Sequence, residues 1–194
     1  MGVMLSAAGS LRWLHDLLGA GYETLLDAAG VWPPGAEGLL FAPYLAGERT
    51  PYPDPDVRGA FTGLDLRHDR GALTRAVLEG VSFGLRDSLE LLRELGVDPV
   101  AGRVSGGGAR SDLWLQIVAS VLGLPLERTA VEEGSAFGAA LLGGVAAGVF
   151  SSAEEAVAAC VRVRETVEPD PAWAASYEEG YARYRTLYPR LRRY

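Results

Sequence analysis

Short apolar segments alternate with helical patterns along this chain, and this alternation restricts it to the α/β class of folds. We expect extended segments at residues 39–42, 59–64, 103–105 and 124–128. The 194 residues contain no internal repeat and no change of composition that marks a linker, so we expect a single domain over residues 1–194. The helical patterns lie at residues 11–18, 22–29, 69–95, 111–122, 134–148, 151–160 and 172–188.

The longest helical pattern, residues 69–95, has an apolar stripe and a charged stripe. Val77 and Val81 belong to the apolar stripe, whereas Arg75 and Glu79 lie opposite it. We therefore expect Arg75 and Glu79 on the solvent side of this helix. Near the start of the chain, we expect Val3-Met4-Leu5 to be the end of a strand and Ser10 to cap the first helix.

The composition excludes several classes of site. The chain has no Lys, because all 18 basic residues are Arg, so it cannot contain a Walker-A or Schiff-base lysine. With Cys160 as the single cysteine and only His15 and His68, a disulfide framework, a cysteine zinc site and a histidine metal cage are not expected. The net charge of -7 disfavours a nucleic-acid surface. Residues 137–150, the most apolar stretch, are too few to span a membrane, so we expect a cytoplasmic protein.

Three consecutive glycines, Gly106, Gly107 and Gly108, stand between an extended segment and a helix. Without Cβ atoms they allow a ligand to approach the backbone, and the following helix N-terminus favours a phosphate or a ribose. The pattern is neither G-x-G-x-x-G nor a P-loop, and Asp112 would repel a pyrophosphate. A tight turn that only packs remains the alternative at this point.

The helix expected at residues 134–148 carries a stripe of small residues that includes Ala136, Ala139, Ala140 and Gly143. Such a stripe is typical of a buried helix in a crowded core. It is also typical of a helix that slides or pivots against another.

Prolines at alternate positions, Pro51, Pro53 and Pro55, exclude both a helix and a central strand. Residues 44–55 are therefore expected to be a shaped loop. The simplest interpretation of its charged residues, among them Glu48, is that they are solvated.

These features occur in an order that resembles the FGGY family of carbohydrate kinases, most closely its xylulokinase branch. The resemblance covers nearly the whole chain and is firmest over residues 40–150. Several spaced motifs in order make it specific. The stretches that carry it are PYLAGERTP (43–51), RGAFTGL (58–64), RAVLEGV (75–81), GGGARSDLW (106–114) and EGSAFGAA (133–140).

The resemblance implies a ribonuclease-H-like domain of the actin, hexokinase and Hsp70 type, with a mixed sheet flanked by helices. It implies that an adenine nucleotide lies against the glycine turn, and that the helix at residues 134–148, through Ala136, Ala139, Ala140 and Gly143, is the hinge against a partner domain. The nucleotide-binding residues it implies are Gly106, Gly107, Gly108, Ala109 and Asp112.

The chain departs from the family pattern at two positions. Ala72 stands where members often have a polar residue, commonly His, and Asp112 stands where some have Asn. An acid at residue 112 can accept a hydrogen bond from a ribose or adenine donor, but it does not favour an α-phosphate.

The resemblance also implies what lies elsewhere in such an enzyme. ATP is the phosphoryl donor and Mg²⁺ its partner, while the catalytic Asp, the Mg²⁺ ligands and most sugar contacts belong to an N-terminal domain. We expect this domain, and the first strands of the present one, to precede Met1. No residue of this chain is therefore expected to be catalytic or to bind a metal.

We therefore expect the C-terminal nucleotide-binding domain of an ATP-dependent kinase of D-xylulose or a related sugar. Its partners would be an adenine nucleotide, the sugar mainly through the N-terminal domain, and a second copy of the chain. One alternative is a non-catalytic structural or dimerisation module that keeps the fold. Another is a dinucleotide-binding oxidoreductase domain, which the lack of G-x-G-x-x-G and of a strand-ending acid ~20 residues later disfavours.

The sequence predicts that the 194-residue chain alone does not phosphorylate a sugar. The reason is that Asp54, Asp56, Asp65 and Asp69 lie in expected loops and lack the strand-borne setting of a catalytic base. A coupled assay with ATP, Mg²⁺ and xylulose should give the rate of a protein-free blank. Turnover above that blank contradicts the prediction.

Overall fold

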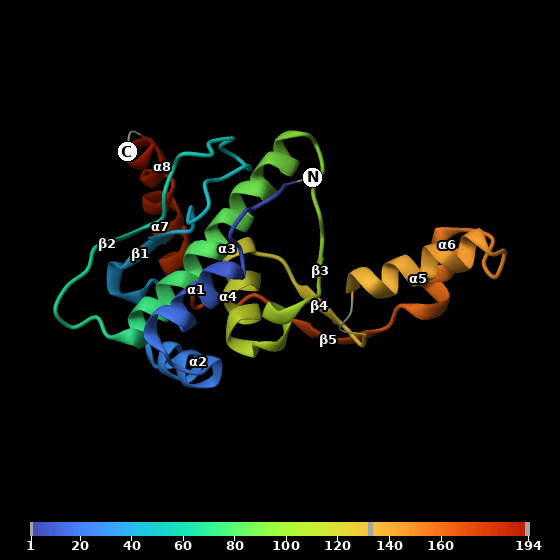
Figure 1. Ribbon diagram of the computed structural model, residues 1–194, viewed down its shortest axis with the longest axis horizontal. Helices are drawn as coiled ribbons and strands as arrows, with labels where there is room; N and C mark the ends of the chain where they lie inside the picture. Colours follow the sequence, from blue (N-terminus) through green and yellow to red (C-terminus); the bar gives the residue numbers. More distant parts are fainter. Residues whose placement is uncertain (1, 132–133, 193–194) are drawn as a thin grey trace.

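Helix α3 (Arg70–Glu94) runs through the middle of the molecule, and several helices and strand β1 pack on it (Figure 1). Its buried residues extend around the helix over most of its length, because neighbours cover several of its sides. The elements in contact with it include α1 (Gly9–Leu18), α2 (Tyr22–Val31), β1 (Leu40–Ala42), α4 (Asp112–Leu122) and α7 (Ala174–Tyr184).

The structure, a computed structural model, describes residues 2–131 and 134–192. Residues 132–133, at the start of the small-residue helix motif, therefore lie outside the described residues. The remaining elements are η1 (Ala36–Gly38), β2 (Ala60–Thr62), β3 (Gly102–Val104), η2 (Gly107–Arg110), β4 (Leu126–Thr129), α5 (Gly134–Ala146), α6 (Ala153–Cys160), β5 (Val163–Val167) and α8 (Leu187–Leu191).

The strands form two small sheets. β1 and β2 pair antiparallel, and the second sheet has the order β3-β4-β5, with β3 parallel and β5 antiparallel to β4. This mixed sheet with helices around it confirms the expected fold class. Helices α5 and α6 project past the sheet, away from α3 (Figure 1).

Strand β1 lies directly on the backbone of α3 at Gly80. A Cβ atom at this glycine would stand 2.2 Å from the carbonyl oxygen of Phe41. No side chain fits there, so the glycine sets how closely the strand and the helix approach.

The prediction that Arg75 and Glu79 face solvent is wrong. Both residues are 1% exposed, and the Arg75 Nε donates to Glu79 Oε1 at 2.7 Å. The pair has further partners in distant segments, since Arg75 Nη2 donates to the Tyr177 hydroxyl at 2.7 Å and the Gly35 amide donates to Glu79 Oε1 at 2.9 Å. The charged stripe is thus covered by the turn before β1 and by α7.

Two predictions near the start of the chain are also wrong. Ser10 lies inside α1, its hydroxyl buried, and the residue at the cap position is Ala8. Val3 belongs to no strand. Its amide donates to the Thr50 Oγ1 at 3.0 Å and its carbonyl accepts from the Thr50 amide at 3.1 Å, so it is held by the proline-rich loop.

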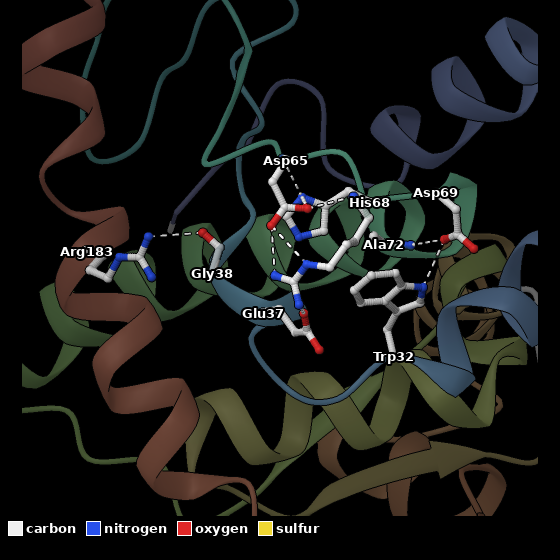
Figure 2. A network of polar contacts seen from close by, with 9 residues as sticks. Trp32, Glu37, Gly38, Asp65, His68, Asp69, Ala72 and Arg183 are labelled. Carbon is white, nitrogen blue, oxygen red and sulfur yellow. Dashed lines mark hydrogen bonds and ion pairs between the residues drawn. The ribbon is translucent and has the colours of Figure 1, made fainter.

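Asp69 begins α3 and connects it to the turn after α2. Its carboxylate accepts hydrogen bonds from the amides of Gly71 and Ala72, as expected of an N-cap. It also accepts from the indole of Trp32 at 2.9 Å, and Figure 2 shows this bond and the one from Ala72. One side chain thus fixes the start of the longest helix and the position of the preceding segment.

The proline-rich loop and the C-terminal region differ from expectation in detail. Glu48 is 3% exposed rather than solvated, because it accepts hydrogen bonds from the amides of Leu5 and Arg49. Burial raises the pKa of its carboxyl.

The helix expected at residues 172–188 is divided into α7 and α8, and β5 was not predicted.

Asp87 is a buried acid at the contact between α3 and α7. The Tyr181 hydroxyl donates to its Oδ1 at 2.8 Å, and its Oδ2 is buried without a hydrogen-bond partner among the described residues. Burial raises the pKa of Asp87 to about 6. Its unfolded value is about 3.9, so the native state binds more protons between about pH 4 and pH 6, and stability falls as the pH rises through this range.

The substitution Asp87→Asn should remove this dependence. Relative to the wild type, its free energy of unfolding should improve by about 2 to 3 kcal/mol between pH 4 and pH 7. Urea denaturation at both pH values measures it, with the exposed Asp98→Asn as the control. Parallel pH profiles for wild type and Asp87→Asn would contradict the prediction.

Candidate functional site

The three glycines form a tight turn between β3 and α4, as predicted. Gly106 has φ 88° and ψ -176°, which an L side chain rarely adopts. Residues Gly107–Arg110 make one 3-10 turn, in which the Ala109 amide donates to the Gly106 carbonyl at 3.0 Å. Ser111 then caps α4 by accepting from the Trp114 amide at 3.1 Å.

The three glycines have different roles. Gly106 provides the left-handed backbone, and a Cβ at Gly108 would stand 3.0 Å from the Trp114 ring, so both are needed for the turn. A Cβ at Gly107 would meet nothing within 4 Å. The same is true of Gly106, but its positive φ disfavours a side chain there, so Gly107 is the glycine at which an added side chain would enter open space without backbone strain.

That space belongs to a pocket of about 350 Å³ between the glycine turn and the first two helices. Tyr22 lines this pocket, and its ring stacks on His15 with 4.3 Å between the ring centroids. The lining is more apolar than polar, with Arg12 contributing a positive charge. The lining residues are Ala8, Leu11, Arg12, Tyr22, Leu26, Gly107, Gly108, Arg110, Ser111 and Trp114.

A second pocket, of about 260 Å³, lies on the other side of the turn at the carboxyl ends of β3 and β4. Gly106 and Ala109 line it, together with Arg128 and Arg164. Arg128 is an interior arginine whose guanidinium pairs with Asp112 at 2.6 Å and also with Glu165. This network joins the start of α4 to β4 and β5.

The predicted nucleotide-binding residues are thus near one another but not in one pocket. Gly107 and Gly108 line the larger pocket, Gly106 and Ala109 line the smaller one, and Asp112 lines neither. Arg12 and Tyr22, which also line the larger pocket, were not predicted from the sequence. No pattern within the sequence connects the first two helices to the glycine turn.

Helix α5 has no buried residue. Ala136, Ala139, Ala140 and Gly143 are all exposed, so the interpretation of this stripe as part of a crowded core is wrong. Contact with a helix of another domain requires an exposed face of this kind.

Within residues 2–131 and 134–192, no three His, Cys, Asp or Glu side chains gather in a way that could hold a metal ion. Nor does any helix in this described part combine the length and apolar character needed to cross a membrane.

Comparison with known proteins gives consistent results. Residues 1–147 match the family model for the FGGY family of carbohydrate kinases, C-terminal domain. The chain is 39% identical over 190 residues to the xylulose kinase of Staphylococcus epidermidis, covering 97% of this chain and 38% of that protein. It is 39% identical over 155 residues to the gluconokinase of Bacillus licheniformis, covering 73% of this chain and 30% of that protein.

Among solved structures, the xylulose kinase from Rhodospirillum rubrum superposes with a TM-score of 0.85 and 38% identity, over 98% of this chain and 39% of that one. The chain therefore spans about two fifths of the length of the xylulose kinases that it matches.

The mixed sheet and these neighbours define a domain of the ribonuclease-H-like sugar-kinase class. The chain belongs to the FGGY family of carbohydrate kinases and matches its C-terminal domain. The family membership excludes the oxidoreductase alternative.

The exposed α5 leads to a prediction about association. An apolar helical face left open to water favours self-association, so the 194-residue chain should form dimers or larger species. Ala140→Glu, which adds a charge to this face, should shift the chain toward monomer, whereas Ala175→Glu on the exposed side of α7 should not. Sedimentation equilibrium measures both, and a monomeric wild type at high concentration contradicts the prediction.

Proposed function

We propose that this chain provides the adenine-nucleotide half of the active site of an ATP-dependent sugar kinase. The observation that supports it most is the pocket of about 350 Å³ between the first two helices and the glycine turn. Pockets for small ligands typically begin at about 300 Å³ and are mostly apolar with a few polar groups.

The lining suits an adenosine. Tyr22 offers an aromatic wall that His15 holds in place, and Leu11 and Leu26 offer apolar surface for the base. The turn at Gly107 and Gly108 lets the nucleotide approach the backbone without a Cβ in the way. In this proposal, Arg12 faces the more polar part of the nucleotide.

The reaction that we propose for the whole enzyme is transfer of the γ-phosphoryl group of ATP to a hydroxyl of D-xylulose or a related sugar. Such transfers depend on positioning of the two substrates and on neutralisation of phosphate charge. This chain's part is to bind and orient the nucleotide. The proposed sugar class rests on the named activities of the relatives, which include xylulose kinases and a gluconokinase.

Mg²⁺, when bound, neutralises the phosphates of ATP. An ion held by the phosphates of ATP needs only one or two protein carboxylates. In line with the resemblance, which implies that the Mg²⁺ ligands and the catalytic base belong to an N-terminal domain, we assign neither to a residue of this chain. The exposed face of α5, with Ala136, Ala139, Ala140 and Gly143, is proposed as the hinge surface toward a partner domain.

The second candidate is a structural or dimerisation module that keeps the fold without nucleotide binding. The exposure of α5 favours it, since this helix presents its small residues to solvent. The two functions differ in whether the glycine turn binds ATP, which a titration decides.

ATP should bind the 194-residue chain with an affinity on the order of millimolar, because a few backbone hydrogen bonds and partial burial of the base offset the ordering cost only modestly. Amide NMR shifts at residues 106–113 should move during the titration. In Gly107→Val they should stay constant, because the new side chain fills the open space that the glycine leaves.

Gly143→Val is the matched control, since a Cβ at this helical glycine also meets nothing within 4 Å. It should bind ATP like the wild type. If wild-type shifts stay flat to ~10 mM ATP, well above the expected constant, the chain is not a nucleotide binder and the structural module is the better function.

A further inference from the structure

An acid lies next to the place where the nucleotide is proposed to bind, although it lines neither pocket beside the turn. Asp112 is the first residue of α4 and directly follows Ser111, which lines the larger pocket. Its side chain is 89% exposed. A carboxylate suits the N-terminus of a helix, but it repels any anion bound nearby.

Arg128, on strand β4, forms an ion pair with the Asp112 carboxylate. Its Nη2 lies 2.6 Å from the Asp112 Oδ1, and its side chain is only 10% exposed. The other side of the guanidinium pairs with Glu165, which in turn lies 3.3 Å from Arg164. Arg128 is thus fixed between α4 and β5, and it cannot leave Asp112 without giving up a largely buried position.

We propose that Arg128 is a positioning residue for nucleotide binding, which compensates the charge of Asp112 so that the glycine turn accepts a ligand with negative phosphates. The proposal rests on the proposed function. It assigns Arg128 no contact with the ligand, since its guanidinium acts through Asp112.

Asp112 would affect ATP binding because its carboxylate lies close to the segment that would hold the phosphates. Asp112 adjoins the pocket lining, so its carboxylate lies within roughly one Debye length, about 8 Å at physiological salt, of the chain segment that would hold the ligand. Unpaired, it would repel ATP, which is strongly anionic, and it would leave uncharged adenosine almost unaffected. An arginine with a purely structural role would affect both ligands equally.

The test compares adenosine with Mg²⁺-free ATP by NMR titration of the 194-residue chain. In Arg128→Gln, ATP should bind about tenfold more weakly, whereas the affinity for adenosine should change less than twofold. In Asp112→Asn, ATP should bind about threefold more tightly. Adenosine should bind as in the wild type, because the structure places Asp112 in the lining of neither pocket beside the turn. The double variant should bind ATP within about twofold of the wild type, since Glu165 keeps Arg164 as a partner.

The ion pair between Arg103 and Glu127, 2.9 Å apart in the same sheet, supplies the controls. Its residues line neither pocket beside the turn, so Arg103→Gln and Glu127→Gln should leave both affinities unchanged. In Arg128→Gln, the loss of affinity for ATP relative to adenosine should become smaller as the salt concentration is raised.

Equal weakening of both ligands in Arg128→Gln, or no weakening, overturns the proposal. If Arg128→Gln does not fold, the exposed Asp112→Asn still tests the proposal. An unchanged ratio of ATP affinity to adenosine affinity in Asp112→Asn overturns the proposal as well. If the wild type binds neither ligand, the proposed function itself fails, and this inference fails with it.

Discussion

The buried ion pair between Arg75 and Glu79 is the interaction on which the arrangement of this domain depends. Both charges are removed from water, which is costly unless each is well paired. Here Arg75 also donates to the Tyr177 hydroxyl and the Gly35 amide donates to Glu79 Oε1, whereas Glu79 Oε2 is buried without a hydrogen-bond partner among the described residues. The pair therefore requires α7 and the turn before β1 to lie on α3, and three segments far apart in the sequence are held by one contact.

The glycine turn takes its position from the same helix. Trp114, on the first turn of α4, donates its indole N–H to the Leu78 carbonyl of α3 at 3.2 Å. The same ring lies against Gly108, where a Cβ would be 3.0 Å away. The core thus places the turn through a single tryptophan. The α1 and α2 side of the pocket is placed on α3 independently, so both walls depend on this one helix.

The sequence predicted what local chemistry determines. The turn at Gly106, the start of α4 near Ser111 and the start of α3 at Asp69 each follow from one or two neighbouring residues, and the structure has them. Arg75 and Glu79 were misplaced because an amphipathic pattern assumes that one side of a helix faces water, whereas α3 is covered on several sides. The pocket wall at Tyr22 could not be predicted, since packing alone brings Tyr22 to the same pocket as the turn.

The central claim is that an adenine base lies between the first two helices and the glycine turn. Intermolecular NOEs between the adenine H2 and H8 protons of ATP and the methyl groups of the chain test it most directly. The account predicts NOEs to Leu11 and Leu26, which line that pocket. NOEs only to Val104 or Thr129, which line the pocket on the other side of the turn, would contradict it.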